Sequence, residues 1–307
     1  MQALLSTIAT LPLPVDAQRF FHGRGGLHPG CGHWALDTYP PVWLLTGFEP
    51  ASDAELATVG QALQQRWQQL APGQALNWVY QCRHEGRTTT RLMVGAVPQP
   101  HVVTEDGTQF LVHVLQGQNH GLFLDMAEGR RWLRADLAAR PGQKLLNLFA
   151  YTCAFSVVAL QAGAAQVVNV DMSRGALATG QQNHRLNGQA GGASFLPHDI
   201  FSSWGRIGRS GPYDLVIVDP PSYQLGSFVA SKDYPRLMRR LPDLLVPGGR
   251  ALLCLNAPEL GPDFLRDHMT QSAPELVFEQ RLANPAAFAD VSAQRSLKVL
   301  VYGKPAA

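Results

Sequence analysis

Three acidic residues in the second half of the chain directly follow apolar segments typical of β-strands. They are Asp171, Asp199 and Asp219. The carboxyl ends of parallel strands meet at one edge of a sheet, and ligands of open α/β sheets bind at that edge. We expect Asp171 to accept hydrogen bonds from both hydroxyl groups of a ribose. Asp199 could accept a hydrogen bond from an adenine amino group.

The loop after the apolar segment KLLNLF (144–149) contains no glycine between positions 147 and 153. A nicotinamide dinucleotide needs a G-x-G-x-x-G loop so that the backbone can approach its pyrophosphate. S-adenosylmethionine has a ribose but no phosphate, and it escapes that requirement. The sequence therefore predicts S-adenosylmethionine as cofactor. The further residues expected to contact it are Asn147, Phe149, Tyr151, Thr152 and Met172.

A proline-rich corner, Asp219-Pro220-Pro221-Ser222-Tyr223, ends the segment YDLVIVDPP (213–221). Methyl transfer from a sulfonium is an in-line displacement, so the protein mainly has to align donor and acceptor and exclude water. The corner offers a carboxylate and backbone carbonyls, and Tyr223 could stack on a planar substrate. Asp219, Pro220 and Tyr223 are thus candidate catalytic residues, with Asp219 also a candidate cofactor contact. Alternatively, the two prolines only terminate a strand.

Apolar strands alternate with helices from residue 144 to the tail segment SLKVLVYG (296–303). This alternation predicts a doubly wound, Rossmann-like α/β domain with helices on both faces of a parallel sheet. The first part of the chain differs, with a helical pattern at 53–70 and hairpin patterns at 77–95 and 101–115. We expect a small α+β domain over 1–100, a β-hairpin and linker over 101–135, and the Rossmann-like domain over 136–307.

The composition of the whole chain sets wider limits. The formal net charge is +2, which permits a polyanionic partner without demanding one. The four cysteines show no spacing typical of a zinc site, so we expect reduced thiols and no bound metal. No apolar run is long enough to span a membrane, and the N-terminus lacks the basic start of a signal peptide. These features predict a cytoplasmic protein.

Six segments resemble, in the same order, the large-subunit ribosomal RNA methyltransferases of the cytosine-C5 and guanine-N7 types. They are GLFLDMAEGRRWL (121–133), LLNLFAYTCAFSVVAL (145–160), VDMSRGAL (170–177), NHRLNG (183–188), DLVIVDPPSY (214–223) and PGGRALLCLN (247–256). The resemblance implies an RNA substrate, with no DNA partner expected. It also implies that the linker closes over the cofactor, with Asp125 at the methionine end, Asp171 at the ribose and Asp199 at the adenine end.

The resemblance also bears on the methylated atom. The cytosine-C5 relatives carry a nucleophilic cysteine where our alignment places Asn256, and the guanine-N7 type carries asparagine there. We therefore expect a base nitrogen as acceptor, Asn256 as a catalytic candidate, and Cys254 as a buried, inert thiol.

Other functions remain open from the sequence. The low net charge and a front domain unlike those of the resembled group favour a methyltransferase for a small molecule or a protein. Cys153, where the resembled group usually has glycine, would suit a non-catalytic RNA-binding protein with a vestigial cofactor fold. A basic cluster, Arg236, Arg239 and Arg240, is either a solvated helix face or an RNA contact.

Overall fold

The computed structural model describes residues 1–221, 223, 224 and 228–306. The chain separates into two compact units. Unit 1 comprises Met1–Leu124 and Pro285–Ser292, and unit 2 comprises Asp125–Asn284 and Ala293–Ala307. The segment from 285 to 292 therefore packs with unit 1, although unit 2 precedes and follows it in the sequence. No helix in the described part of the chain has the length and apolar character needed to cross a membrane.

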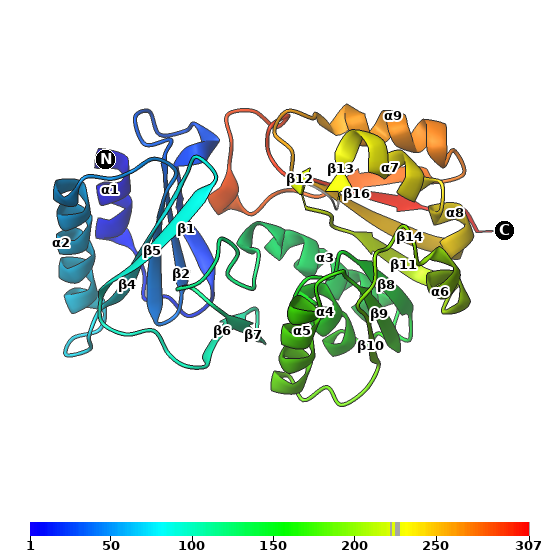
Figure 1. Ribbon diagram of the computed structural model, residues 1–307, viewed down its shortest axis with the longest axis horizontal. Coiled ribbons are helices and arrows are strands. Elements are labelled where there is room, and N and C mark those ends of the chain that lie inside the picture. The colour runs from blue at the N-terminus through cyan, green and yellow to red at the C-terminus, as the bar shows by residue number, and fades with distance from the viewer. Residues whose placement is uncertain (222, 225–227, 307) are drawn as a thin grey trace. The chain divides into compact units, whose positions relative to one another are not determined.

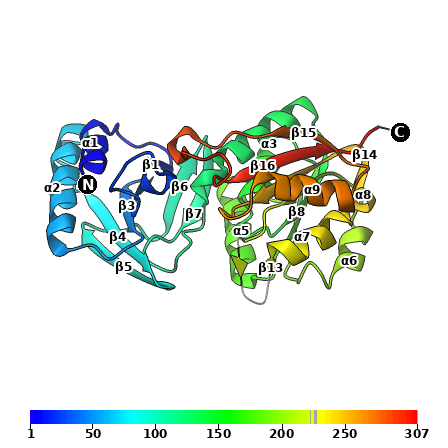
Figure 2. The ribbon, with the colours of Figure 1, turned by 90° about the horizontal axis from the view of Figure 1, so that it is seen from above.

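Unit 1 contains a five-stranded sheet with two helices on one face (Figure 2). The strands lie in chain order as β1 (Gln18–His22), β2 (Trp34–Tyr39), β3 (Val42–Gly47), β4 (Asn77–His84) and β5 (Arg87–Val94). The helices are α1 (Gln2–Thr10) and α2 (Asp53–Leu70), a short 3-10 helix η1 spans Gly23–Gly25, and a separate hairpin joins β6 (His101–Glu105) to β7 (Thr108–Val112). This is the expected α+β organisation, and the predicted helix and both hairpins are confirmed.

The sequence did not reveal α1 or β1 to β3. Every residue of β2 and β3 is buried, so neither strand shows the alternation of apolar and polar residues that marks a half-exposed strand. The glycines and prolines between residues 20 and 50 also suggested loops.

Unit 2 begins with η2 (Leu124–Met126), which reaches across the boundary, and α3 (Ala127–Ala139). Its first half continues with β8 (Lys144–Leu148), α4 (Ala154–Gln161), β9 (Gln166–Val170), α5 (Arg174–Leu186), β10 (Ala193–Leu196), α6 (Trp204–Arg209) and β11 (Tyr213–Val218). Its second half contains β12 (Tyr223–Gln224), β13 (Phe228–Val229), α7 (Ala230–Met238), α8 (Leu241–Leu244), β14 (Leu245–Leu255), α9 (Pro262–Ser272), β15 (Val277–Arg281) and β16 (Lys298–Gly303), with η3 (Ala286–Phe288) in the segment that joins unit 1.

The main sheet of unit 2 has the order β10-β9-β8-β11-β14-β16-β15. The five strands from β10 to β14 pair in parallel, as predicted, whereas β16 runs antiparallel to both of its neighbours. The strand order reverses between β8 and β11, because β9 lies on the other side of β8. Such a reversal leaves a crevice at the carboxyl ends of the two central strands.

Helices cover both faces of this sheet (Figure 1). Side chains from α6, α7, α8 and α9 pack on one face, and side chains from α3 and α4 pack on the other. Alternate strand residues serve the two cores: Val216 and Val218 face the first, while Leu215 and Ile217 face the second. The sequence predicts a single helix over 232–245, but the structure has two, α7 and α8. A turn at Arg239 and Arg240 separates them, and Pro242, which lacks a backbone donor, lies at the start of α8.

A buried chain of polar side chains ties β8 and β9 to α4 and α5. The Asn147 amide donates to Asn169 Oδ1 at 2.9 Å, and the Asn169 amide donates to Ser156 Oγ at 2.9 Å. Ser156 in turn hydrogen-bonds His184 Nε2 at 3.0 Å. Burial of each group is acceptable because the next group supplies its partner. The network fixes the two strands whose ends hold the candidate site.

A substitution at Asn169, in the middle of this network, is expected to lower the free energy of unfolding. Asn169→Leu removes the partner of Asn147 and one partner of Ser156, and an unpaired buried polar group costs about 1–3 kcal/mol. The double variant Asn147→Leu/Asn169→Leu is expected to be more stable than Asn169→Leu alone, since it leaves one fewer group unpaired. Urea unfolding followed by circular dichroism measures both. Additive losses from the two substitutions would contradict a coupled network.

Candidate functional site

The loop between β8 and α4 has an unusual backbone. Phe149, Tyr151 and Cys153 adopt positive φ angles of 58°, 47° and 62°. This left-handed region costs a residue with a side chain about 1 kcal/mol or more, and such strain concentrates at ligand sites. The loop lies at the carboxyl end of β8, next to the reversal of strand order. The predicted contact residues from Phe149 to Thr152 therefore lie at the expected edge of the sheet.

Asp171 holds this loop in place from the end of β9. Its Oδ2 accepts a hydrogen bond from the Tyr151 backbone N–H at 2.8 Å, and its Oδ1 accepts one from the Ser173 N–H at 2.8 Å. A carboxylate has about four acceptor positions, so both oxygens keep the capacity to accept from a ligand diol. Met172, 54% exposed, follows directly. The geometry suits the ribose contact predicted for Asp171.

A second carboxylate, Asp219, follows β11 within a cluster of ionisable side chains from other elements. Asp125 and the buried Arg130 act on it electrostatically, and the Cys254 thiol of β14 donates a hydrogen bond to it. Burial and the Asp125 carboxylate raise the pKa of Asp219 to about 7, against the opposing effects of Arg130 and the thiol. Near neutral pH the site therefore favours a positively charged ligand group, which would stabilise the ionised carboxylate. We call Asp125, Arg130, Asp219 and Cys254 the carboxylate cluster.

Cys254 is only 1% exposed, as expected for an inert thiol. Burial and the neighbouring Asp219 raise the pKa of Cys254 well above its usual value. Its backbone carbonyl accepts a hydrogen bond from the Tyr234 hydroxyl of α7. Asn256, two residues further on, is exposed just beyond the end of β14.

Three other predicted residues have different surroundings. Asn147 is 2% exposed and its amide is engaged with Asn169, which argues against the predicted contact between its side chain and the cofactor. The Phe149 ring packs edge-to-face on Phe228, with 5.3 Å between ring centroids. Asp199 is exposed, and its carboxylate accepts a hydrogen bond from the Phe201 N–H at 2.7 Å.

The proline corner is described only in part. Pro220 is buried directly after Asp219, and Tyr223 begins β12. The side chain of Tyr223 and the whole of Ser222 lie outside the described residues.

Sequence reasoning missed the roles of Arg130 and Cys254 in the carboxylate cluster. In the structure Val218 of β11 pairs with Leu253 of β14, which brings the next residues, Asp219 and Cys254, close together. The missing information was which strand neighbours β11. For Arg130 no comparable signal exists, because α3 reaches the cluster only through tertiary packing.

Cys153 is accommodated by a glycine on the facing helix. The thiol is fully buried, and a Cβ atom added to Gly180 of α5 would lie 2.4 Å from its sulfur. The side chain therefore points toward α5, where it packs with Ala150 and Leu177. The absent side chain at Gly180 thus leaves room for the Cys153 thiol, at a position where the resembled group usually has glycine.

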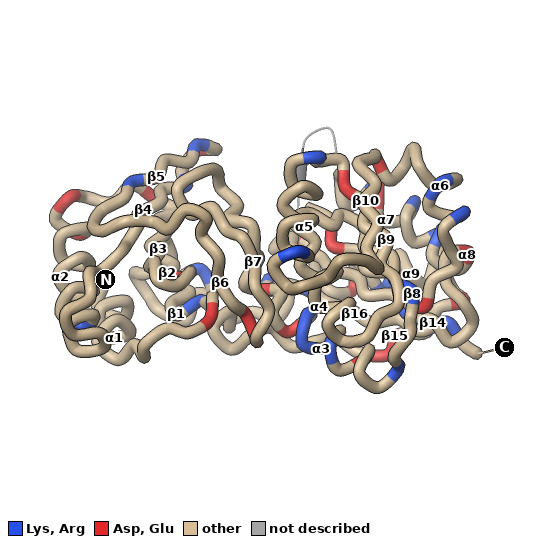
Figure 3. The backbone as a smooth tube through the Cα atoms, turned by 90° about the horizontal axis from the view of Figure 1, so that it is seen from below, with Lys and Arg blue, Asp and Glu red and all other residues tan. Residues whose placement is uncertain are grey.

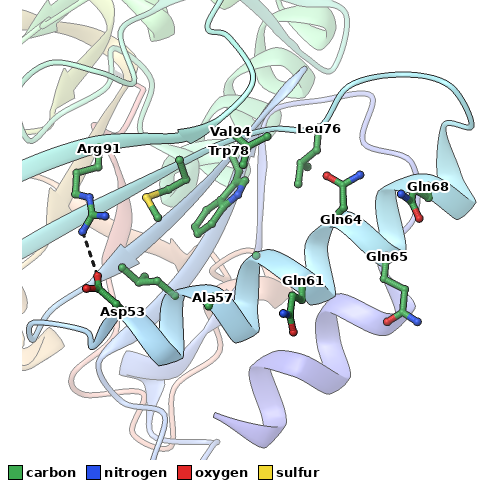
Figure 4. Close-up of a pocket in the computed structure, with 13 residues that line it drawn as sticks. Asp53, Ala57, Gln61, Gln64, Gln65, Gln68, Leu76, Trp78, Arg91 and Val94 are labelled. Carbon is green, nitrogen blue, oxygen red and sulfur yellow. Dashed lines mark ion pairs between the residues drawn. The ribbon is translucent and has the colours of Figure 1, made fainter.

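A separate groove of about 670 Å³ lies in unit 1 between α2 and β4–β5 (Figure 4). Its lining includes four glutamines of α2, the Trp78 ring, and Arg91, which pairs with Asp53 at 3.8 Å. None of the carboxylates predicted from the strand ends belongs to this lining. The candidate site for chemistry is therefore the strand edge of unit 2.

Comparison with known proteins decides the family. The family model of S-adenosylmethionine-dependent methyltransferases matches residues 18–303. The chain belongs to this family. The cofactor of the family is thus the one predicted from the glycine-free loop and Asp171.

Curated relatives of this methyltransferase are named as ribosomal RNA methyltransferases. It is 34% identical over 169 residues to ribosomal RNA large subunit methyltransferase I of Aeromonas salmonicida, which covers 52% of this chain and 41% of that protein. With the protein of the same name from Erwinia tasmaniensis it shares 27% identity over 282 residues, covering 89% of this chain and 70% of the relative. The first match thus spans about two fifths of the relative's length.

Solved structures share the fold. A candidate S-adenosylmethionine-dependent methyltransferase from Streptococcus mutans superimposes with a TM-score of 0.81 at 22% identity, covering 98% of this chain and 81% of the other. Another candidate methyltransferase, solved with S-adenosylhomocysteine, gives a TM-score of 0.80 at 22% identity, with coverages of 98% and 78%. At these sequence identities the structural similarity establishes the fold alone, the Rossmann-like methyltransferase fold that the alternation of strands and helices predicts.

The ribose assignment of Asp171 can be tested by substitution. Asp171→Asn replaces a charged acceptor by an amide, and a hydrogen bond to a charged group contributes about 1.5–3 kcal/mol. We expect S-adenosylhomocysteine affinity, measured by calorimetry, to fall roughly tenfold to a hundredfold. Asn147→Leu is the control, with lower stability and unchanged affinity. Equal affinities for wild type and Asp171→Asn would remove Asp171 from the site.

The pairing of Cys153 with Gly180 predicts a rescue. Gly180→Ala places a methyl group against the thiol, and overpacking of this kind costs about 1–3 kcal/mol. In a Cys153→Gly background the same substitution is expected to be tolerated, since the obstructing sulfur is absent. Thermal unfolding of the four proteins completes the double-mutant cycle. A Gly180→Ala loss that is the same in both backgrounds would show that the thiol is not what it meets.

The raised pKa of Asp219 makes stability depend on pH. The native state binds this proton more tightly than the unfolded chain, so stability is lost as pH rises from about 4, the unfolded value, to about 7, the folded one. In the ligand-free protein, the free energy of unfolding of Asp219→Asn minus that of wild type is expected to increase by about 2 kcal/mol as the pH rises from 5 to 8. The exposed Asp267→Asn on α9 is the matched control. A difference between Asp219→Asn and wild type that is constant across this range would contradict the raised pKa.

Proposed function

We propose that this protein transfers the methyl group of S-adenosylmethionine to a base nitrogen of RNA, with large-subunit ribosomal RNA as the substrate. The family match and the names of the curated relatives support methyl transfer and an RNA acceptor. The observation that carries the proposal is the carboxylate cluster, which gathers at the carboxyl edge of the sheet beside the Asp171 loop. From this proposed substrate we also infer a cytoplasmic location.

The residues of the strand edge fit the parts of the cofactor. When bound, S-adenosylmethionine supplies a methyl group on a positively charged sulfonium. Asp171 accepts from the ribose hydroxyls, and Asp199 accepts at the adenine end, near Met172. Asp125 and Asp219 offer negative charge to the cationic methionine portion. The positive charge of that portion would offset the cost of holding two carboxylates close together. The backbone of Phe149, Tyr151 and Thr152 shapes the wall of the site.

The acceptor side of the site favours a nitrogen over a carbon. Attack on C6 of a cytosine needs an accessible thiolate. Cys254 is buried, its thiol donates to Asp219, and its pKa is raised, so it stays protonated and out of reach. A base nitrogen with a lone pair needs no such nucleophile. Asp219, Pro220, Tyr223 and Asn256 then position the base, which has to leave any helical stack to reach them.

The direct test is chemical analysis of RNA. Ribosomal RNA from cells lacking the gene is incubated with the protein and methyl-labelled S-adenosylmethionine, and its nucleosides are analysed by mass spectrometry. We expect one labelled nucleoside, methylated on nitrogen. Asp219→Ala is expected to reduce turnover roughly a hundredfold, because small displacements of the reacting atoms cost about that much. Labelling of protein or small molecules with none in RNA would refute the proposal.

The choice of nitrogen over carbon has its own test. Cys254→Ser is expected to retain most activity, with some loss of stability. RNA containing 5-fluorocytidine traps a covalent enzyme intermediate in cytosine-C5 chemistry, so we expect no denaturant-resistant adduct. An adduct that forms with wild type and disappears in Cys254→Ser would overturn the nitrogen assignment.

A further inference from the structure

A groove of about 420 Å³ on unit 2 combines arginines with aromatic rings. Its lining residues are Phe201, Trp204, Arg236, Arg239 and Arg240. The two rings come from the segment between β10 and α6 and from the first residue of α6, and the arginines come from the end of α7 and the turn before α8. We call this surface the arginine groove. None of its residues belongs to the carboxylate cluster or to the Asp171 loop.

The groove is built as alternating guanidinium groups and rings. The guanidinium carbon of Arg236 lies 4.5 Å from the centre of the Phe201 ring, and that of Arg240 lies 5.8 Å from the Trp204 ring. The two rings meet edge-to-face, with 6.1 Å between their centroids. Arg236 is also fixed by an ion pair with Asp233 at 2.9 Å. Part of the side-chain arrangement is thus set before any ligand binds.

The positive charge of this surface is largely uncompensated. Arg239 and Arg240 are exposed, and within the described part of the chain neither forms an ion pair. Helix α6 adds Arg206 and Arg209, which are also exposed and form no ion pair in that part of the chain. Figure 3 shows blue Lys and Arg positions along α6. The whole chain carries a net charge of only +2, so this concentration of arginine is local. Locally concentrated positive charge attracts polyanions more strongly than the net charge suggests.

The groove arginines and the carboxylate cluster lie toward opposite ends of the parallel strands β11 and β14. Asp219 follows the carboxyl end of β11, whereas Arg239 and Arg240 precede α8 and the amino end of β14, which pairs in parallel with β11. A strand of six residues, the length of β11, spans about 20 Å. A ligand that occupied both places would need to be a chain, because no single nucleotide spans this distance.

We propose that the arginine groove binds the sugar–phosphate backbone of single-stranded RNA flanking the methylated base, with unstacked bases against the Phe201 and Trp204 rings. The inference rests on the proposed function and adds a second contact region to it. Guanidinium groups present forked donors that match phosphate oxygens, and they stack on planar groups. Bases stack on aromatic side chains regardless of sequence.

An acidic protein segment fits the same surface less well. Carboxylates would satisfy the guanidinium groups, but an acidic peptide offers no planar groups to occupy the ring faces. The pairing of rings with arginines is the arrangement by which proteins hold single-stranded nucleic acid. RNA uses both components of the groove, so it is the occupant we argue.

The test measures binding of a fluorescent 20-nucleotide oligouridylate to the full chain by anisotropy, from 50 to 200 mM KCl. Arg239→Gln/Arg240→Gln is expected to lower the slope of log affinity against log salt by about 1.4, since each lost contact with single-stranded RNA contributes about 0.7. Affinity at 100 mM KCl is expected to fall roughly tenfold. Calorimetry with S-adenosylhomocysteine is expected to show unchanged affinity, which demonstrates an intact fold and cofactor site.

The matched control removes the same charge elsewhere. Arg87→Gln/Arg185→Gln alters two exposed arginines that form no ion pair in the described part of the chain, and its slope is expected to stay close to wild type. Equal losses in both double variants would show diffuse attraction and overturn the groove. Trp204→Leu is expected to weaken oligouridylate binding about fivefold while sparing inorganic polyphosphate. Equal binding of polyglutamate and oligouridylate would overturn the choice of RNA.

The groove and the proposed function can fail separately. If wild type methylates ribosomal RNA and Arg239→Gln/Arg240→Gln does so with the same KM and kcat, the groove is wrong and the function stands. A raised KM for RNA with unchanged kcat supports the groove, because its residues lie away from the reacting atoms. If oligouridylate binding depends on the groove but no RNA nucleoside is ever labelled, the groove stands and the function is wrong.

Discussion

The parallel pairing of β8, β9, β11 and β14 is the constraint on which the candidate site depends. Residues far apart in sequence, such as Asp171, Asp219 and Cys254, reach one edge only because these strands run in the same direction and end together. The polar network through Asn147 and Asn169 fixes two of the strands in register. A shift of one residue in any pair would turn these side chains to the opposite face of the sheet.

The site stores unfavourable energy that a ligand could release. Three residues of the β8–α4 loop hold left-handed backbone conformations, and a partly buried carboxyl lies close to a second carboxylate. Both features cost stability in the ligand-free protein. Both also prepare the edge for a ligand that carries positive charge and hydroxyl groups, which is the chemistry of the family's cofactor. The surrounding core, with helices on both faces, supplies the stability that tolerates this cost.

Charged residues of this protein gather in local clusters that its net charge does not reveal. Carboxylates gather where the cofactor is proposed to bind, and arginines gather on the last turn of α7 and the turn that follows it. The net charge of +2, which sums 25 basic and 23 acidic residues over the whole chain, does not reveal these local concentrations. A low net charge therefore does not argue against an RNA substrate, because association with a polyanion responds to the local field.

The sequence by itself determined the Rossmann-like domain, its alternation of strands and helices, and the acidic residues at the strand ends. These follow from local patterns, since continuous apolar runs and helical periodicity reflect burial within a few residues. It did not show β2 and β3, which are buried on both faces and lack alternation, or the segment 285–292, which packs with unit 1. It also assigned Asn147 to the cofactor, although its amide is engaged in the core.

Only the tertiary structure decided which side chains meet. Asp219 is hydrogen-bonded by Cys254 and acted on by the charge of Arg130, and Cys153 packs against Gly180. These interactions, like that of Arg236 with Phe201, join elements whose neighbours in space no local pattern specifies. Strand order and helix packing result from the collective burial of apolar surface over the whole unit. For that reason the sequence predicted which residue types form the site. The pKa of Asp219, the partners of each side chain and the space for Cys153 were determined by the fold.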